Sequence, residues 1–287
     1  MDSKIKNNII AHRNGLKYGM KDLHSFIIPA FGDSPFLEEC IQSLMHQTVK
    51  SPILIATSTP SPYIKDIAQK YRLNIRINPE EHSGIASDWN FAFAQASTLY
   101  VTLAHQDEIY HQDYSSVIIR HVSQFDRKTV SIIFTGYREL VGNKLLKGPS
   151  FHARIKKILL LPYVLKSNMA SIWVKKASLS LGTPICCSSV TYHKDFLQGF
   201  TFSDRYKVAL DWHAWRTLAA QDGYFCYINK KLISHRIHPG TETFRQIQSG
   251  LRYEEELDIF TSIWGKTMAK FLMKLYVYGH RINSKSA

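Results

Sequence analysis

Short apolar runs alternate with segments of helical periodicity over the first part of the chain. Runs of strand length, each ending in polar or turn-forming residues, are 24–31, 52–57, 73–77 and 99–104. Apolar residues spaced as on one helix face lie between them, at about 34–46, 62–71 and 85–96. We expect Ser34 to cap the first helix and Pro35 to be its first residue. Strands and helices in alternation with short connections predict an α/β fold with a mostly parallel sheet and helices on both faces.

The pattern is less regular in the second part. The expected elements are a helix over 113–125, a strand over 130–134, a hairpin around Gly142 and Asn143, a basic amphipathic helix over 153–165, a strand over 184–190, a helix over 207–221, a strand over 223–228, a polar loop over 234–243 and two closing helices. We therefore divide the chain into an extension (1–23), an α/β domain (24–243, with halves 24–136 and 137–243) and C-terminal helices (244–287).

Composition limits the class of protein. A chain of 287 residues, 45% of them hydrophobic, can fill one large α/β domain. Residues 1–22 are basic and lack the apolar core of a signal peptide, so we expect a cytoplasmic protein. The longest apolar run, 158–165, is too short to span a bilayer and contains Pro162. The four cysteines have neither disulfide-framework nor zinc-site spacing, and we expect reduced, packed thiols.

The net charge of +13 is concentrated in two segments without any acid. Residues 140–194 contain nine Lys and Arg, and residues 259–287 contain five. Subtracting these fourteen from the 36 Lys and Arg leaves 22, against 23 acidic residues, so the rest is nearly neutral. Focused positive charge attracts phosphate groups on a nucleotide, a nucleic acid or an anionic membrane. We expect no nucleic-acid partner, because no recognised binding motif is present and aromatic residues are not interleaved with the basic runs.

Two adjacent acids follow the fourth predicted strand. Asp107 and Glu108, close to His105, come just after the apolar run 99–104. In an open parallel sheet, ligands bind at this end of the strands. Carboxylate oxygens suit Mg²⁺ or Mn²⁺ and leave coordination positions for phosphates. Taken alone, the two acids are equally compatible with an acidic loop or the start of a helix.

Several segments, in order, resemble the inverting GT-A glycosyltransferases of family 2. They are Phe26–Phe31, Leu37–Thr48, Gly84–Asn90, His105–Glu108 (the DxD region), Asp211–Trp212 and Arg236–Thr243. The resemblance implies a GT-A, Rossmann-like fold with a C-terminal helical extension. It also implies transfer of a sugar from a nucleotide-diphosphate sugar to an acceptor hydroxyl with inversion, in the assembly of a cell-surface polysaccharide or other glycan. Bound Mn²⁺ or Mg²⁺ would offset the charge of the departing diphosphate.

The resemblance also assigns catalytic and metal-binding roles. Asp107 is the expected metal ligand, with Glu108 beside it and His238 completing the site or touching the diphosphate. Asp211 is the expected general base, and the tryptophans beside it would provide a water-poor wall that raises its pKa. The alternative role for Asp211 is to cap the helix that follows.

The expected donor-binding residues are Pro29, Ala30, Phe31, Thr57, Gly84, Asp88, Asn90, Gln106, Trp212 and Arg236. Phe31 would stack on the base and Arg236 would neutralise phosphate charge, whereas ordinary helix-face roles explain Asp88 and Asn90 equally well. The chain departs from the family at His105, which stands in place of the first DxD acid and weakens the case for metal binding. The stretch 56–59 carries hydroxyl groups where many relatives have an aspartate that hydrogen-bonds uracil. The identity of the donor nucleobase is therefore left open.

Other functions remain open. A nucleotidyltransferase would need a Gly-rich, Lys-containing phosphate loop, which 29–33 does not offer. An inactive relative would act as a binding subunit. In the last segment an apolar stripe runs beside Lys266, Lys270 and Lys274. Such a helix either packs on the domain or lies on an anionic membrane, at the inner face of the plasma membrane, where it would meet a lipid-linked or other glycan acceptor.

Overall fold

A computed structural model of the chain describes residues 11–13, 16–18, 23–80, 84–124, 129–142, 144–146, 148, 151–238 and 250–284. The strands in this part of the chain are β1 (Ala11–Arg13), β2 (Leu16–Tyr18), β3 (His24–Ala30), β4 (Ile53–Thr57), β5 (Asn74–Ile77), β6 (Tyr100–Leu103), β7 (Ile109–Tyr110), β8 (Val130–Val141), β9 (Lys144–Leu145), β10 (Asn168–Met169), β11 (Val190–His193) and β12 (Tyr224–Ile237). The α-helices are α1 (Leu37–Met45), α2 (Pro62–Tyr71), α3 (Ile85–Gln95), α4 (Tyr114–Ser123), α5 (Phe151–Leu159), α6 (Leu161–Leu165), α7 (Ile172–Ser178), α8 (Leu210–Ala219) and α10 (Leu251–Ser284).

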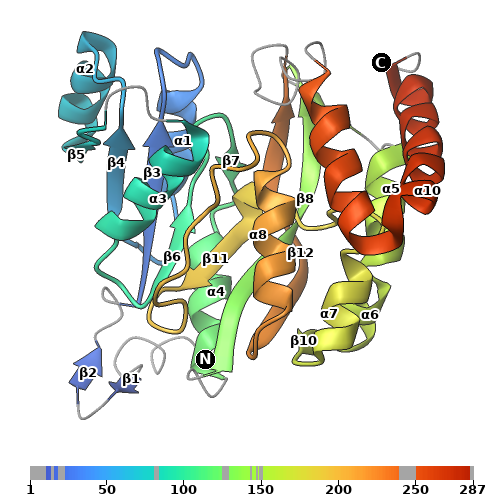
Figure 1. Ribbon diagram of the computed structural model, residues 1–287. Helices are drawn as coiled ribbons and strands as arrows, with labels where there is room; N and C mark the ends of the chain where they lie inside the picture. Colours follow the sequence, from blue (N-terminus) through green and yellow to red (C-terminus); the bar gives the residue numbers. More distant parts are fainter. Residues whose placement is uncertain are drawn as a thin grey trace.

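One ten-stranded sheet forms the centre of the molecule (Figure 1). Its main strand order is β10-β12-β8-β11-β6-β3-β4-β5, and β7 and β9 pair at the sides with β12 and β8. Strands β5, β4, β3 and β6 are parallel, as the strand–helix alternation predicted. Strand β11 runs antiparallel between β6 and β8, while β12 is parallel to β8. The second half of the sheet is therefore mixed, because only the first half has a helical crossover between every pair of strands.

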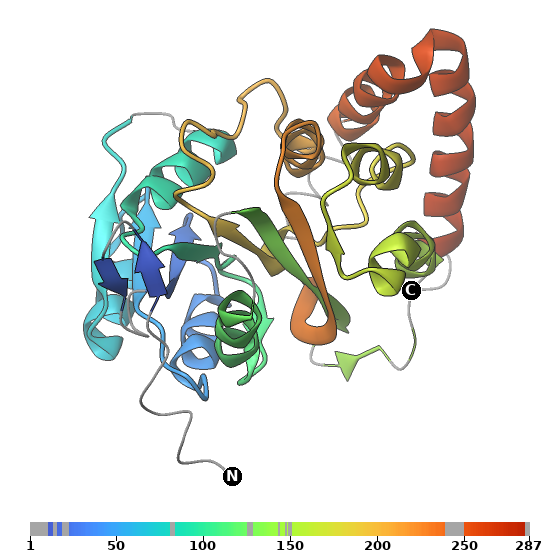
Figure 2. The same ribbon diagram turned by 90° about the horizontal axis from the view of Figure 1, so that it is seen from below.

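Helices cover both faces of this sheet, as Figure 2 shows end on. One core lies between the sheet and α1, α2 and α4. The other lies between the sheet and α3, α6, α8 and α10. Every residue of β6 is buried, as expected for a strand covered on both sides. The carboxyl end of β6, where the two acids follow, is thus held on a rigid support.

Three local predictions were wrong. Helix α1 begins at Leu37, after a turn in which the Leu37 N–H donates to the carbonyl of Ser34 (3.2 Å), so Ser34 does not cap it. The basic helix expected over 153–165 is two helices, with Pro162 in the first turn of α6, where its missing N–H costs no helical hydrogen bond. The strand expected over 184–190 is a 3₁₀ turn at Cys187–Ser189, and β11 begins only at Val190.

The polar loop expected over 234–243 begins later than predicted. Residues 234–237 belong to β12, which pairs with β8 up to Ile237 and Val141. His238 follows directly, and 239–249 lie outside the described residues, as does Asn143 of the predicted hairpin. The pairing of β8 with β9 confirms that hairpin. Because Arg236 lies in a strand, its side chain is fixed and buried rather than mobile in a loop.

The C-terminal prediction of two helices is confirmed. Helix α10 is broken at Gly265, whose φ of 73° and ψ of 163° are not helical. Its first half packs in the core through Ile259 and Phe260, and its second half through Ala269 and Met273. The four cysteines are free thiols, three of them buried. Among the described residues, no helix combines the length and the apolar character that crossing a bilayer requires.

Candidate active site

The two acids lie in a tight turn between β6 and β7. The Glu108 N–H donates to the carbonyl of His105 (3.2 Å), which closes the turn. The thiol of Cys40, on α1, donates to the same carbonyl (3.3 Å). Backbone and helix therefore hold the sequence His105–Glu108 at the carboxyl end of β6, which is the ligand-binding edge of such a sheet.

Glu108 is buried and paired with the end of β12. One carboxylate oxygen accepts hydrogen bonds from His235 Nδ1 (2.6 Å) and the Ser188 hydroxyl (3.1 Å), and the other accepts from the Arg236 N–H (3.2 Å). Burial alone would lower the pKa of His235, but the charge and hydrogen bond of Glu108 raise it above its ordinary value. Glu108 thus ties the turn to β12 through a charged pair. Sequence reasoning missed His235, because it lies 127 residues from Glu108.

Asp107 points to the other histidine of this region. Its Oδ2 lies 3.3 Å from Nε2 of His238, whose ring packs on Phe36 with centroids 4.6 Å apart. Burial would raise the pKa of Asp107, but the hydrogen bond from His238 and the nearby His105 and His235 hold it below its ordinary value. Asp107 is therefore an anion with a half-buried carboxylate, as a metal ligand requires.

His105 completes a group of metal-ligand types. The donor atoms of His105, Asp107 and Glu108 all lie within 4.8 Å of one another. The Nε2 atom of His105 is buried and has no hydrogen-bond partner in the described part of the chain, and its ring packs against Trp89 with centroids 4.9 Å apart. Burial lowers the pKa of His105, so the imidazole is neutral at pH 7 with a lone pair available. A buried, unpaired nitrogen beside two carboxylates fits a divalent cation.

Arg236 is engaged by the protein itself. Its Nε donates to the Asp107 carbonyl (3.1 Å), Nη1 donates to the Gly142 carbonyl (3.3 Å), and Nη2 pairs with Glu39. The guanidinium also lies over the ring of Phe36, 4.3 Å from its centroid. This buried side chain supports the turn, and the expected contact with donor phosphate stays a prediction. Glu39 was missed by sequence reasoning because nothing local marks it as a partner of β12.

Asp211 lies in the first turn of α8. The helix begins after Ala209, so Asp211 is inside it and does not cap it; its Oδ1 accepts from the Trp212 N–H (2.6 Å). Burial raises the pKa of Asp211, against opposing effects of Lys156 and that N–H. Trp212 is itself buried in the core, with Nε1 donating to the Leu179 carbonyl (2.8 Å). Its side chain is therefore not exposed to a ligand, and its expected donor contact remains untested.

The proposed base and the acidic turn share a neighbour. The pKa of His105 responds to the charges of both Asp107 and Asp211. In turn, His105 lowers the pKa of both aspartates. Although 104 positions separate the two aspartates in the sequence, the fold brings both near one imidazole. That the two aspartates belong to one site stays a prediction.

Two further groups of this region were not named from the sequence. Lys156 of α5 affects the pKa of both Asp211 and His235, and its ammonium lies 5.6 Å from the centroid of the Tyr137 ring. Glu255 of α10 accepts hydrogen bonds from three backbone N–H groups at the start of α8, those of residues 207–209 (2.8, 2.8 and 2.9 Å). The C-terminal helix thereby positions the helix that carries Asp211. Only tertiary packing could reveal either contact.

The carboxyl end of β3 presents one aromatic ring to solvent. Phe31 is 53% exposed. The Gln106 side chain accepts from the Phe31 N–H (3.1 Å) and donates to its carbonyl (3.0 Å), which fixes the backbone there. Pro29 is half-buried and Ala30 is buried, in pairing with β4. Phe31 is thus available for stacking, and Gln106 orients it.

Hydroxyl groups line the neighbouring end of β4. Thr57 is buried and accepts from the Thr59 N–H (3.1 Å), and the Thr59 hydroxyl accepts from the Gly32 N–H (2.7 Å). The buried hydroxyl of Ser58 has no hydrogen-bond partner among the described residues. An unpaired hydroxyl of this kind can bind the edge of a nucleobase.

The remaining donor-site candidates lie on α3. Asn90 donates to the Phe202 carbonyl (2.8 Å) and accepts from its N–H (2.7 Å), so its amide holds the segment before α8. Asp88 accepts from the Asn78 amide (3.4 Å). Gly84 precedes α3 and has open space around the position of a Cβ atom, so approach of a ligand is unobstructed there. Their contacts with a donor stay predictions.

Comparison with known proteins identifies the family. The model of the family described as "Glycosyl transferase family 2" matches residues 25–173, slightly more than half of the chain. The chain belongs to glycosyl transferase family 2. This confirms the family expected from the sequence.

Two curated relatives of this family 2 chain come from Bacillus subtilis (strain 168). The chain is 24% identical over 166 residues to the minor teichoic acid biosynthesis protein GgaB, covering 54% of this chain and 18% of that protein. It is 26% identical over 153 residues to the uncharacterized glycosyltransferase EpsJ, covering 48% of this chain and 44% of that protein. The chain thus spans less than half the length of either relative.

Solved structures share the fold of this family 2 chain. TarS residues 1–349 of S. aureus, in complex with UDP, has a TM-score of 0.57 at 13% identity, covering 92% of this chain and 73% of that one. The mannosyltransferase PcManGT from Pyrobaculum calidifontis, in complex with GDP-Man and Mn²⁺, has a TM-score of 0.56 at 15% identity, covering 83% and 63%. The expected GT-A fold is confirmed, and at this identity the likeness concerns the fold alone.

Proposed function

We propose that the protein transfers a sugar, with inversion, from a nucleotide-diphosphate sugar to an acceptor hydroxyl in the assembly of a cell-surface polysaccharide or other glycan. The observation that carries this proposal is that the charges of Asp107 and Asp211 both act on His105, at the carboxyl edge of the sheet of a family 2 chain. The name of GgaB, which refers to teichoic acid biosynthesis, supports the polysaccharide role.

The donor nucleotide would lie across the carboxyl ends of β3 and β4. Phe31 offers an exposed ring for stacking, worth about 1–3 kcal/mol per base. The buried hydroxyl of Ser58 offers a hydrogen bond to a base edge. This position has no charge that would select uracil, so both uridine and guanosine donors belong in the test.

Mn²⁺ or Mg²⁺ would be held by Asp107 with the nitrogens of His105 and His238. The second acid, Glu108, already accepts three hydrogen bonds and is better suited to supporting the turn. When bound, the cation would neutralise charge on the diphosphate. Imidazole ligands favour transition metals over Mg²⁺, so replacement of the first DxD acid by His105 favours Mn²⁺.

Asp211 would accept the proton of the acceptor hydroxyl. As the acceptor oxygen bonds to the anomeric carbon, the bond from that carbon to the diphosphate breaks on the opposite side, which inverts the centre. The raised pKa of Asp211 brings it closer to the value that suits a general base. Lys156 is a candidate for offsetting negative charge in the same region, since the guanidinium of Arg236 is already engaged.

The presence of His105 in place of the first DxD acid also favours a second candidate function. In this alternative, the protein is an inactive relative that binds a nucleotide sugar without turning it over. Incubation of the full chain with UDP-, GDP- and dTDP-sugars and Mn²⁺ or Mg²⁺, with detection of released nucleoside diphosphate, separates the two. Turnover that Asp211→Asn abolishes and Asp66→Asn preserves supports the transferase; Asp66 is exposed on α2, away from the site. Nucleotide binding without turnover supports the binding subunit, and neither binding nor turnover contradicts both.

A further inference from the structure

The two acid-free segments of the sequence meet in the folded chain. Helix α10 contacts α5, and Nε1 of Trp264, beside the break in α10, donates to the Ser180 carbonyl just after α7 (2.8 Å). In both views, α5, α6 and α7 lie on the same side of the molecule as α10 (Figures 1 and 2). Segments about a hundred residues apart therefore form one surface, which we call the basic face: α5, α6, α7 and the second half of α10.

Large apolar side chains are exposed on this face. Leu165 and Trp173 are each 85% exposed, which is unusual for residues of their size. The other exposed apolar residues of these elements are Ile158, Leu161, Val164, Met268 and Phe271. A surface patch of this kind on a soluble domain indicates a binding site for a partner.

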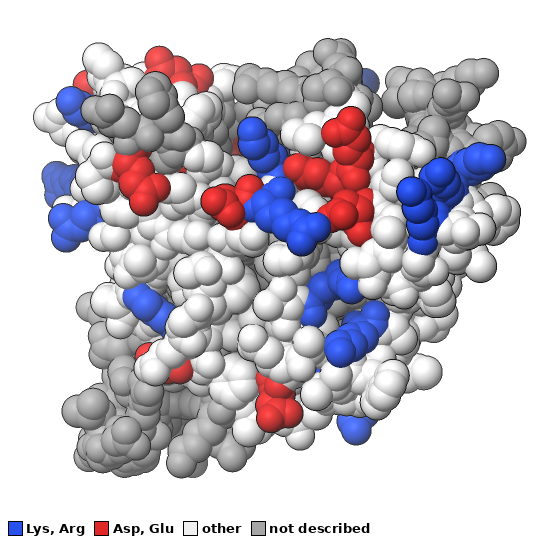
Figure 3. Space-filling model, in the orientation of Figure 1, with Lys and Arg blue, Asp and Glu red and all other residues white. Residues whose placement is uncertain are grey.

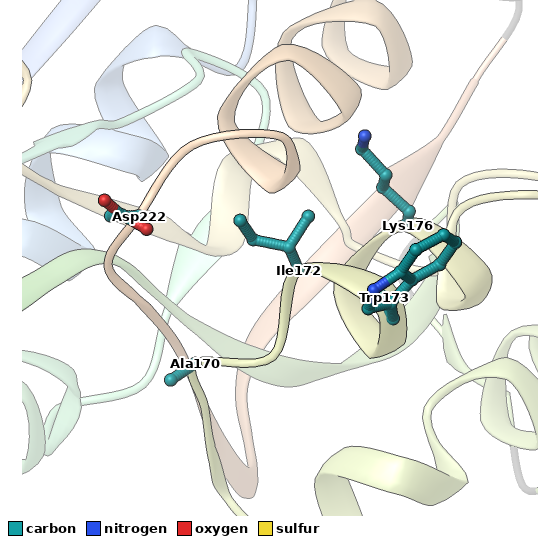
Figure 4. Close-up of a pocket in the computed structure, with 5 residues that line it drawn as sticks. All are labelled: Ala170, Ile172, Trp173, Lys176 and Asp222. Atoms are coloured by element: carbon teal, nitrogen blue, oxygen red, sulfur yellow. The ribbon is translucent and has the colours of Figure 1, made fainter.

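Positive charge surrounds these apolar residues. Exposed basic side chains of the face are Arg154, Lys157, Lys166, Lys176, Lys266, Lys270 and Lys274. Over α10, Figure 3 shows acids on the first half and basic residues without acids on the second. Trp173 and Lys176 line a hollow next to α7, with the one nearby acid, Asp222, on its other side (Figure 4).

Not all of the charge counted from the sequence is available to a partner. The ammonium of Lys175 is buried and donates to the carbonyls of Gln221 and Gly223 (2.7 and 2.8 Å). Lys194 donates to the carbonyl of Ala94 (2.9 Å) at the end of α3. These two lysines stabilise the fold, so the basic residues that remain on the face are those beside the apolar patch.

We infer that the basic face docks on the surface of an anionic lipid bilayer. Exposed leucine and tryptophan side chains would enter the interfacial region while the lysines pair with lipid phosphates. A folded acidic protein would match the charge, but it would leave the scattered apolar tips of three short helices without a complementary groove. A bilayer has no fixed shape to match, which favours it as the occupant.

The face lies beside the candidate site. On α5, Lys156 acts on Asp211, whereas the next two residues, Lys157 and Ile158, are exposed on the face. If the protein is a glycosyltransferase as proposed, a docked enzyme would therefore receive a lipid-borne acceptor close to its base. The docking itself does not depend on that function.

Binding of the full chain to vesicles tests the inference without any measurement of activity. We expect co-sedimentation with vesicles of phosphatidylcholine and phosphatidylglycerol, weak binding to phosphatidylcholine alone, and loss of binding in high salt. Lys166→Gln with Lys176→Gln should weaken binding on the order of 20-fold, at about fivefold for each lysine. The matched double variant Lys65→Gln with Arg76→Gln, which removes the same charge from exposed positions on α2 and β5, should bind normally.

Tryptophan fluorescence identifies the docking element. Of the five tryptophans, Trp89, Trp212 and Trp215 are buried, so only Trp173 and Trp264 can respond to lipid. We expect anionic vesicles to shift the emission to shorter wavelength, and Trp173→Phe to remove most of the shift while Trp264→Phe preserves it. The inference fails if the two double variants bind vesicles equally, or if binding does not depend on the charge of the lipid. It also fails if, without lipid, the chain forms a dimer that Leu165→Ser dissociates.

Discussion

The turn at the end of β6 and the basic face differ in which side chains they bury and which they expose. In and beside the turn, Glu108 and Arg236 are charged, buried and hydrogen-bonded. On the basic face, Leu165 and Trp173 are apolar and almost fully exposed. Burying charge and exposing large apolar groups both reduce stability, so each region keeps an arrangement that folding alone would not favour. This contrast is the one expected if the turn is preorganised for a ligand and the basic face binds a surface, as proposed above.

The largest effect is expected at Asp211, the proposed general base. Asp211→Asn removes the proposed proton acceptor and should lower kcat by about 10²–10⁴-fold, while the Kd for the nucleotide stays unchanged. In the unaltered protein, kcat should fall as the pH drops through the raised pKa of Asp211, because the protonated carboxyl cannot accept a proton. Steady-state rates measured as a function of pH check both. A variant with unchanged kcat would exclude Asp211 as the base.

A smaller effect is expected on metal binding. Asp107→Asn should weaken Mn²⁺ binding by at least about 10–100-fold, the range seen when even an outer partner of a ligand is lost. His105→Asp should restore an oxygen ligand and raise the affinity for Mg²⁺ relative to Mn²⁺. Calorimetry with each metal measures both changes. In ¹⁵N-labelled protein, the coupling between ligand nitrogen and bound Mn²⁺, measured by electron paramagnetic resonance, should be weaker in the His105→Asp variant. Unaltered metal preference would show that His105 is not a ligand.

Glu108 should matter chiefly for stability. Glu108→Gln weakens the hydrogen bonds to the end of β12 and should reduce the free energy of unfolding by about 2 kcal/mol. Because folding raises the pKa of His235, the pair stabilises fully below the unfolded pKa and loses effect as the pH rises through the folded one. Urea unfolding at several pH values measures this. Glu254→Gln, at an exposed position of α10, should change the free energy of unfolding by less than about 0.5 kcal/mol, and an equal loss there would contradict the comparison.

The smallest effect on stability is expected on the basic face. Leu165→Ala should change the free energy of unfolding by less than about 0.5 kcal/mol, because little of the side chain is buried. Five residues earlier, Leu160 is buried, and Leu160→Ala should cost about 2–4 kcal/mol. Thermal or urea unfolding of the two variants gives the comparison. A large loss at Leu165 would mean that the side chain supports the fold rather than a partner.

The amino-acid sequence determined the elements and the order of the first half of the sheet. The apolar run before Asp107 identified a strand buried on both faces, because the periodicity of a segment reports how it is covered. The acidic turn and Asp211 were also found from the sequence. Local signals misplaced the start of α1 and the strand at 184–190, where tertiary contacts override the preference of a few residues.

Tertiary structure alone decided which distant groups meet. The pairing of Glu108 with His235, the burial of Arg236 against Glu39, and the support of α8 by Glu255 join residues that no short pattern connects. The sequence likewise showed two acid-free segments but not that they form a single face. Side-chain periodicity records only whether a position is covered, whereas the identity of the covering group depends on how the elements pack together.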